Sequence, residues 1–382
     1  MVKKKIKKFF ITTFIIVFVF ICMCIICMAT LLLKNKNRTN NNEMQKTLEQ
    51  SQNENDSFIH EDSIYIVPTM LDPIAPNSSW CCTFQLVWND VKNKLAKKDI
   101  ILNPQLDIVN NLNKEDFNES MLSEEYYYKT YGTKTLELKE QIENGIKEKF
   151  DQSSDILNKI DWSRENSNDF LFYSMLYRKF EFFQKFNKLD NDKFGNKYED
   201  VEYFGIDNNN IPKSVRDQIR VLYYNSKEDF ALVIDTKSND EVIFCKNPKG
   251  NTFDKIYKNM NKKIDKYEGS NNFEELDRFK APILNFDETK EYEELSNKEF
   301  RTAEGEKIVI KNAMQTLKLS IDENGGEIKS ELNLLAKASA SIDEKDEGRY
   351  FYVDDTFAIF LREKGKDKPY FAGRIDDISK FQ

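Results

Sequence analysis

The hydrophobic residues of this chain form three zones with different patterns. Residues 9–33 are apolar and uncharged apart from three threonines, residues 34–62 contain almost no apolar side chain, and residues 63–382 alternate short apolar runs with polar turns. A helix of roughly 20 apolar residues spans a bilayer, whereas a polar and charged segment cannot form a core. The pattern therefore predicts a transmembrane helix, a disordered polar linker and one folded domain.

The lysines beside the apolar segment predict its orientation. Residues 1–8 carry five lysines and no acidic residue, whereas three basic residues follow within residues 34–38. Because positive charge accumulates on the cytoplasmic side, we expect a cytoplasmic basic tip at residues 1–8 and a signal anchor at residues 9–33. The domain at residues 63–382 would then be extracellular, on a single-pass protein of the cell membrane. A cleaved signal peptide is the alternative, although its apolar region usually has about 7–15 residues.

Apolar residues at helical spacing predict helices in the first part of the domain. A helix that ends near residue 97 is expected to have Ser78 or Ser79 as its N-cap. A second helix is expected at residues 138–150, where apolar residues recur every four positions. One further helix, near residues 252–264, is expected to interrupt the strands of the later part.

The later part of the domain has the pattern of strands. Residues 169–186 are dense in aromatic residues, and the first half of this stretch is apolar on both faces, which is typical of a central strand in a covered sheet. Further strands are expected at residues 215–224, 229–235, 241–245, 281–286, 307–310, 315–321, 355–361 and 369–375. Helices first and strands later predict an α+β fold with large antiparallel sheets.

The composition argues against several classes of function. The formal net charge of −8 is unsuited to a protein that binds nucleic acid through the phosphates. The single histidine, His60, lies in the linker, so a zinc site or a Ser-His-Asp triad is not expected. No glycine-rich phosphate loop occurs. Residues 190–195 resemble the start of a calcium loop, but Phe194 occupies a ligand position and Val201 stands where the loop needs its bidentate acid. We therefore expect no enzyme activity, no cofactor and no metal.

The cysteines outside the apolar segment are Cys81, Cys82 and Cys245. One interpretation is a disulfide between Cys245 and either member of the adjacent pair, and the other is three buried free thiols. A nucleophilic cysteine would need a base, and the only histidine lies in the linker.

Three segments near the C-terminus occur in an order that resembles a known family. They are residues 317–327 (LKLSIDENGGE), residues 354–362 (DDTFAIFLR) and residues 370–375 (YFAGRI). This order resembles the serpins, the serine protease inhibitor superfamily, in which a strand, an acidic turn and a glycine-bearing hinge precede a long exposed loop and two final strands. Weaker similarity at residues 138–157 and 172–179 extends the resemblance over about residues 135–382.

The resemblance implies a serpin-like fold and a candidate site. N-terminal helices would be followed by large antiparallel sheets, with an exposed reactive-type loop at about residues 326–341. Counted from the hinge, the bond that a protease would cut lies near Ser339-Ala340, with Lys337 as the recognised side chain if the register slips by two. The alternative is that residues 337–341 form only a flexible tip. The candidate binding residues of the hinge and loop are Glu323, Gly325, Gly326, Glu327, Lys337, Ala338, Ser339 and Ala340.

Some residues depart from the family pattern. Ser174 and Gln315 replace an asparagine and a histidine that bond each other in serpins, and a Ser174–Gln315 hydrogen bond can substitute for that contact. Phe182 replaces a tryptophan, which keeps the bulk and removes the indole donor. Residues 326–332 carry bulky and charged side chains where inhibitory members have small ones, which should slow insertion of the loop into a sheet.

The loop residues are compatible with two conformations. Apolar and polar residues alternate over residues 326–338 with one exception, Leu335, which is the pattern of a half-buried strand. Ile328, Leu332 and Leu335 also share one face of a helix, and the segment is rich in helix-forming residues. Both interpretations stay open from the sequence.

The resemblance implies a serine-type endopeptidase inhibitor whose partner is an extracellular serine protease or another protein. The alternative is a non-inhibitory surface binding protein, which the substitutions at Ile328, Lys329 and Glu331 favour. A secreted hydrolase that uses paired acids is a third hypothesis, for which the sequence offers no positive indication.

Overall fold

The computed structural model describes residues 64–162, 168–327 and 348–382. The chain divides into two compact units, Met1–Ser63 and Ile64–Gln382, and every described residue belongs to the second. The expected tip, transmembrane segment and linker lie outside the described residues and stay predictions. Within those described residues, no helix combines the length and the apolarity needed to cross a bilayer.

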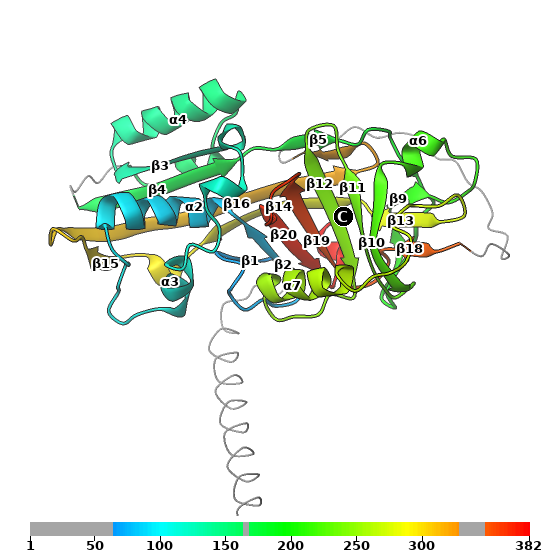
Figure 1. Ribbon diagram of the computed structural model, residues 1–382. Coiled ribbons are helices and arrows are strands. Elements are labelled where there is room, and N and C mark those ends of the chain that lie inside the picture. Colours follow the sequence, from blue (N-terminus) through cyan, green and yellow to red (C-terminus); the bar gives the residue numbers. More distant parts are fainter. Residues whose placement is uncertain (1–63, 163–167, 328–347) are drawn as a thin grey trace, which may run out of the picture. The chain divides into compact units, whose positions relative to one another are not determined.

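The second unit contains three main β-sheets (Figure 1). Sheet I has the order β3 (Tyr127–Thr133), β4 (Asp169–Leu176), β16 (Lys307–Asp322), β17 (Gly325–Glu327) and β5 (Lys179–Glu181), with β14 (Leu284–Glu291) and β15 (Lys298–Arg301) also paired to β16. Sheet II has the order β1 (Tyr65–Val67), β2 (Ser78–Cys81), β20 (Phe371–Ile375), β19 (Phe357–Glu363), β12 (Asp240–Lys246), β11 (Asp229–Asp235) and β10 (Ile219–Ser226). Sheet III has the order β18 (Tyr350–Tyr352), β13 (Arg278–Pro282), β9 (Tyr203–Ile206) and β6 (Asn187–Lys188). A separate hairpin joins β7 (Asp192–Phe194) to β8 (Tyr198–Val201).

The described helices are α2 (Thr83–Asp90), α3 (Asp107–Leu112), α4 (Leu136–Phe150), α5 (Asp155–Asn158), α6 (Lys213–Arg216) and α7 (Phe253–Ile264). A π-helical segment, Val91–Ala96, continues α2. Both longer helices begin at a threonine cap: the hydroxyl of Thr135 accepts a hydrogen bond from the Leu138 amide, and that of Thr252 from the Lys255 amide.

Helices cover both faces of sheet I at β4. On one face lies α4 (Figure 1), whose Ile142 and Ile146 belong to the same buried apolar cluster as Leu171. On the other face, Trp88 of α2 packs in the same apolar cluster as Phe172. Alternate residues of the strand therefore point into two different cores, which confirms the expectation of a central strand covered on both sides.

The predicted elements match the structure best where the sequence is uniformly apolar. The strand expected at residues 229–235 is β11, and the helix expected near residues 252–264 is α7. The strands expected at residues 307–310 and 315–321 are one continuous strand, β16. The order of helices and strands confirms an α+β architecture dominated by antiparallel pairing.

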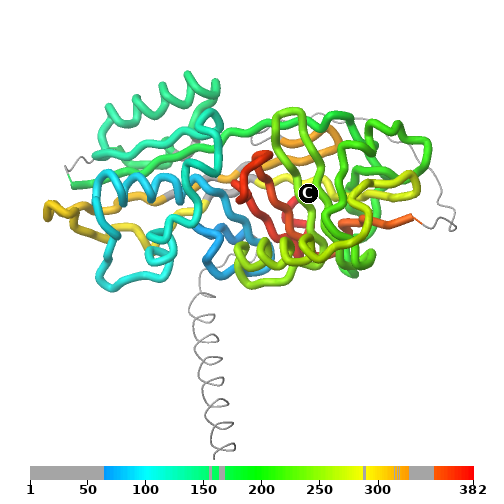
Figure 2. Tube along the Cα trace, in the orientation of Figure 1, coloured from blue at the N-terminus to red at the C-terminus, as the bar shows by residue number. Residues whose placement is uncertain are grey.

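The predicted cap at Ser78 or Ser79 is wrong. Both residues lie in β2, where Ser79 pairs with Gly373 of β20, and the helix begins only at Thr83. Figure 2 shows these N-terminal residues in blue beside the red C-terminal strand. Pairing with a strand almost three hundred residues away overrides the local capping preference of serine, because tertiary contacts outweigh propensity.

The three cysteines at positions 81, 82 and 245 are free and buried in the structure. The interpretation of buried thiols is therefore the one that the structure supports, and the alternative disulfide is not formed there.

Candidate functional site

The hinge predicted from the sequence forms an internal strand of sheet I. β16 ends at Asp322, the chain reverses, and β17 returns antiparallel to it, with Gly326 opposite Ile321. The other edge of β17 pairs with β5, where Gly326 lies opposite Phe180. The first residues after the turn are thus already held between two strands.

Asp322 and the glycines that follow define this turn. The Asp322 carboxylate accepts hydrogen bonds from the amides of Asn324 (2.7 Å) and Gly325 (3.3 Å). Gly325 has φ of 142°, a conformation that other residues rarely adopt. A β-carbon on Gly326 would overlap the ring of Phe180. Both glycines are therefore required by the close approach of β17 to β5.

The segment after β5 holds the turn from outside the strand pair. The Phe182 amide donates to the Asn324 carbonyl (2.9 Å), and the Phe186 amide donates to the Glu323 carbonyl (2.9 Å). The Lys185 ammonium lies 3.2 Å from the Glu323 carboxylate. The turn and the segment 182–186 therefore form one hydrogen-bonded unit.

The structure brings four of the candidate residues together at this turn. They are Glu323, Gly325, Gly326 and Glu327. The backbone of Glu327 pairs with both Ser320 and Lys179. The other four candidates, Lys337, Ala338, Ser339 and Ala340, lie outside the described residues.

An aromatic cluster lies beneath the hinge. Phe182 is 2% exposed, and its ring centroid is 5.1 Å from that of Phe186. Phe186 in turn lies 5.5 Å from Phe279 of β13, which connects the hinge of sheet I to sheet III. Phenylalanine at position 182 thus keeps an apolar role at the place where the family resemblance suggested a tryptophan.

The side chain of Gln315 bonds residues other than Ser174, the partner that could have substituted for the family's contact. The Gln315 side chain accepts from the hydroxyl of Tyr292 (2.7 Å) and donates to the carbonyl of Cys81 and the hydroxyl of Thr83 (both 3.1 Å). Its amide is therefore engaged by residues near the start of the domain, a set of contacts that adjacent sequence does not indicate.

One edge of β16 is only partly covered. β4 pairs with it from Val309 to Ala313, and β17 pairs with it from Ser320 to Asp322. Among the described residues, no strand pairs with the stretch between these two regions on that edge, while β14 covers the opposite edge there. Backbone donors and acceptors on an uncovered strand edge can pair with a further strand.

A buried ion pair lies where β4 gives way to β5. The Arg178 guanidinium contacts the Asp240 carboxylate at 2.7 and 2.9 Å, and Tyr370 donates its hydroxyl hydrogen to the same carboxylate (3.0 Å). Burial raises the pKa of the Asp240 carboxyl, and the guanidinium of Arg178 opposes this shift. This pair was not predicted from the sequence, although an arginine inside an aromatic strand pattern is a signal that could have identified it.

The chain after residue 347 is anchored in a different sheet. β18 pairs parallel with β13 in sheet III, with Phe351 opposite Phe279. The Phe351 side chain is fully buried. The segment between β17 and β18 therefore connects an internal strand of sheet I to an edge strand of sheet III.

No group of three or more His, Cys, Asp or Glu side chains in the described ranges is arranged to hold a metal ion.

Comparison with known proteins gives remote structural similarity only. No protein-family model matches the chain, and no curated protein matches it in sequence. A solved structure of Serpin48, a highly specific serpin of the insect Tenebrio molitor, has a TM-score of 0.35 and 16% identity, covering 62% of this chain and 63% of that one. SRPN18 from Anopheles gambiae has a TM-score of 0.38 and 11% identity, with coverage of 62% and 64%. Human thyroxine-binding globulin in complex with thyroxine has a TM-score of 0.37 and 13% identity, with coverage of 67% and 77%.

The chain thus spans less than two thirds of the length of the two insect proteins. Scores of this size do not assign the chain to a family.

Proposed function

We propose that this chain is a membrane-anchored, serpin-like inhibitor of an extracellular serine-type endopeptidase. The observation that carries the proposal is the uncovered edge of β16 between its pairings with β4 and β17. β17 already points along this edge, and the chain that follows it contains the alternating residues at positions 326–338. The proposed inhibitory step is the extension of β17 into that space after a protease cuts the loop.

The register of β17 specifies how an extended strand would pair. Gly326 lies opposite Ile321, so continuing the antiparallel register places Ile328 opposite Leu319 and Ser330 opposite Leu317. Leu319, Leu317 and Ile321 are all buried. Residues that face each other in an antiparallel pair lie on the same side of the sheet, so Ile328 would enter the apolar core. Burying such a side chain stabilises the inserted form by about 1.5–3 kcal/mol.

The proposed mechanism follows from this gain in stability. The serine of the protease attacks a peptide carbonyl of the loop, and the C–N bond breaks as the amine takes up a proton and stays on the part of the chain that leads to β18. The new carboxyl end is then held as an ester, and the strand extends before water can hydrolyse it. The protease is then carried along sheet I, and its active site is distorted. In this mechanism the chain supplies a cleavable bond and a strand that gains contacts, and it needs no catalytic residue of its own.

The expected membrane location belongs to the same proposal. The apolar segment at residues 9–33, preceded by five lysines, supports an anchor that holds the domain outside the cell. The linker at residues 34–62 would allow the domain to reach proteases near the membrane surface.

The test is incubation of the full-length chain with trypsin-like, elastase-like and subtilisin-like proteases. An inhibitor forms a complex that survives SDS, and its variant Ile328→Asp should be cleaved without forming that complex, because a carboxylate would have to enter the core. Ile101→Asp is the matched control, since Ile101 is 67% exposed, and it should keep the complex. If all three proteases simply cleave the loop, with no stable complex, the inhibitory function is wrong.

A second candidate function is a non-inhibitory surface binding protein with the same scaffold. The charged residues Lys329 and Glu331 in the hinge favour it, because charged side chains slow the entry of a strand into a sheet. Thermal unfolding distinguishes the two: cleavage near Ser339 should raise the melting temperature by tens of degrees if the strand inserts, and leave it almost unchanged otherwise.

A further inference from the structure

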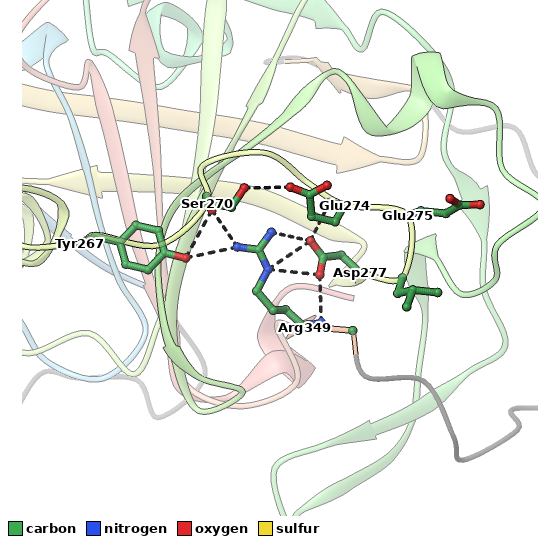
Figure 3. A pocket seen from close by; sticks show the side chains of 8 residues that line it. Tyr267, Ser270, Glu274, Glu275, Asp277 and Arg349 are labelled. Atoms are coloured by element: carbon green, nitrogen blue, oxygen red, sulfur yellow. Dashed lines mark hydrogen bonds and ion pairs between the residues drawn. The ribbon is translucent and has the colours of Figure 1, made fainter.

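The chain is held tightly where it leaves the segment 328–347 and enters sheet III. Gly348 lies against the backbone of Leu276, so closely that a β-carbon at position 348 would overlap the Leu276 carbonyl. Next to it, the Arg349 side chain lies over the segment 267–277, which connects α7 to β13 (Figure 3). These residues line a shallow pocket together with Tyr267, Ser270, Glu274 and Asp277.

All the donors of the Arg349 guanidinium are used by that one segment. Nε and Nη2 donate to the Asp277 carboxylate, the closer contact being 2.6 Å. Nη1 donates to the Ser270 carbonyl (2.8 Å) and to the Tyr267 hydroxyl (3.2 Å), and Nη2 also donates to the Asn272 carbonyl. A guanidinium has five N–H groups in a fixed fork, and here each has an acceptor. A lysine, with three donors and no fork, cannot reproduce this arrangement.

The segment that receives Arg349 is itself fixed to sheet II. The Asn271 side chain donates to the Val221 carbonyl (2.7 Å), and the Val221 amide donates to the Asn271 carbonyl (2.8 Å). The Asp277 side chain is only 3% exposed, and that of Arg349 is 19% exposed. The ion pair is therefore largely shielded from water and joins the chain after residue 347 to a rigid support.

β18 is a short strand at the edge of sheet III. Only Tyr350, Phe351 and Tyr352 pair with β13, at the edge of the sheet. Short parallel pairs are among the weaker elements of a sheet. The buried ring of Phe351 and the Val353 amide, which donates to the Lys280 carbonyl, hold this strand together with the five donors of Arg349.

We propose that Arg349 is a positioning residue: its bonds to Asp277 and the segment 267–277 keep β18 on sheet III and fix the C-terminal end of the segment 328–347. The inference rests on the proposed function for the role of that segment as the loop that meets a protease. β17 pairs in sheet I and Arg349 bonds to the segment 267–277, so the described residues on both sides of residues 328–347 are fixed. We call the bonds between Arg349 and the segment 267–277 the latch. If the latch is lost, β18 can leave sheet III, and a protease then cuts the segment 328–347 at a different position.

The experiment compares Arg349→Lys with wild type and with Arg362→Lys as a matched control. Arg362 binds Glu241 at 2.6 and 2.8 Å and donates to the Tyr257 hydroxyl (2.8 Å), with 24% and 5% exposure of the two ionic side chains. The control therefore weakens an ion pair of similar burial, also shared with a tyrosine, that joins two strands of sheet II. Asp277→Asn removes the carboxylate charge from the Arg349–Asp277 pair at nearly constant volume. It replaces Arg349→Lys in the experiment if the lysine variant does not fold.

Hydrogen exchange of the full-length proteins is the direct readout. The Val353 amide donates to the Lys280 carbonyl (2.7 Å), so its protection reports whether the end of β18 is docked. We expect Arg349→Lys to raise exchange at residues 350–353 by about tenfold or more, and Arg362→Lys to leave it unchanged. Limited digestion with subtilisin should also give a different distribution of first cuts within residues 328–347 only for the Arg349 and Asp277 variants.

The outcomes separate this inference from the proposed function, because neither readout requires inhibition. Unchanged exchange at residues 350–353 in the Arg349 and Asp277 variants overturns the latch. An equal increase in the Arg362 control also overturns it, since the effect would then be general loss of stability. Faster exchange confined to residues 350–353 in the Arg349 and Asp277 variants would support the latch. If wild type also formed no SDS-stable complex, only the proposed inhibitory function would be wrong.

Discussion

The backbone of Gly325 lies so close to that of Phe180 that a β-carbon at position 325 would overlap the Phe180 carbonyl oxygen. The two residues lie far apart in the sequence, and they are in contact because β17 is held between β16 and β5. The hinge is therefore part of the packed sheet and not a loose connection between sheet and loop.

Gly325→Ala should destabilise the protein by about 1–3 kcal/mol, because it combines an unfavourable φ of 142° with a backbone clash. Urea unfolding of the full-length chain measures the loss. Gly305→Ala is the control: Gly305 has φ of 92°, also positive, but open space around the position of its β-carbon. If both variants lose the same stability, φ strain alone explains the result and the close contact at the hinge contributes nothing.

The glycines of this hinge could be located from the sequence through the family resemblance, because the Gly-Gly pair follows an acidic turn at the place where that resemblance implies a hinge. The strand at residues 229–235 could be predicted because its middle is a short, continuous apolar run rich in β-branched residues and bounded by polar ones, which favours a covered strand over a helix. In both places the local pattern and the tertiary structure require the same residues.

The missed features depend on contacts between residues far apart in the chain. Ser79 has the local properties of a helix cap, and only its pairing with Gly373 places it in a strand. Gln315 could have bonded Ser174, but it reaches Cys81 and Thr83, more than 230 residues earlier. No local pattern reports such pairings, so the sequence alone could not locate them.

Arg178→Met should cost about 3–5 kcal/mol, because it leaves the carboxylate of Asp240 buried without its partner. The double replacement Arg178→Met with Asp240→Leu should recover much of that loss, since no unpaired charge remains. Lys97→Met is the control, because Lys97 and Glu304 form a contact of 2.6 Å with more than half of each side chain exposed.

The control should change the free energy of unfolding by no more than about 1 kcal/mol. Chemical denaturation of the four proteins measures these differences. A double variant that is less stable than the single variant would show that the ion pair contributes more than the avoided cost of a buried charge.

The three described cysteines should react slowly with a thiol reagent in the native protein. Cys81, Cys82 and Cys245 are all buried, and burial raises the pKa of the Cys245 thiol to about 11. At about pH 8 only a minute fraction of this thiol is ionised, and the thiolate is the reactive form. The measurement is thiol titration in a variant whose Cys22, Cys24 and Cys27 are replaced by alanine, before and after denaturation. Rapid native labelling of Cys245 would contradict its burial.

Stability in acid should depend on Asp229, at the end of the β10–β11 hairpin. Lys263 of α7 approaches its carboxylate at 2.6 Å, and Asn225 and Tyr223 also donate to it. Burial would raise the pKa of Asp229, but the hydrogen bond from Lys263 prevails and the pKa is lowered below the ordinary 3.8.

A depressed carboxyl pKa contributes stability above the unfolded pKa and loses it as the pH falls through the folded value. The stability difference between wild type and Asp229→Asn should therefore shrink between about pH 6 and about pH 3. Lys263→Met should make this difference in the free energy of unfolding less dependent on pH, as measured by urea unfolding at each pH. A difference between wild type and Asp229→Asn that stays constant down to the lowest pH would mean that Lys263 does not lower the pKa of Asp229.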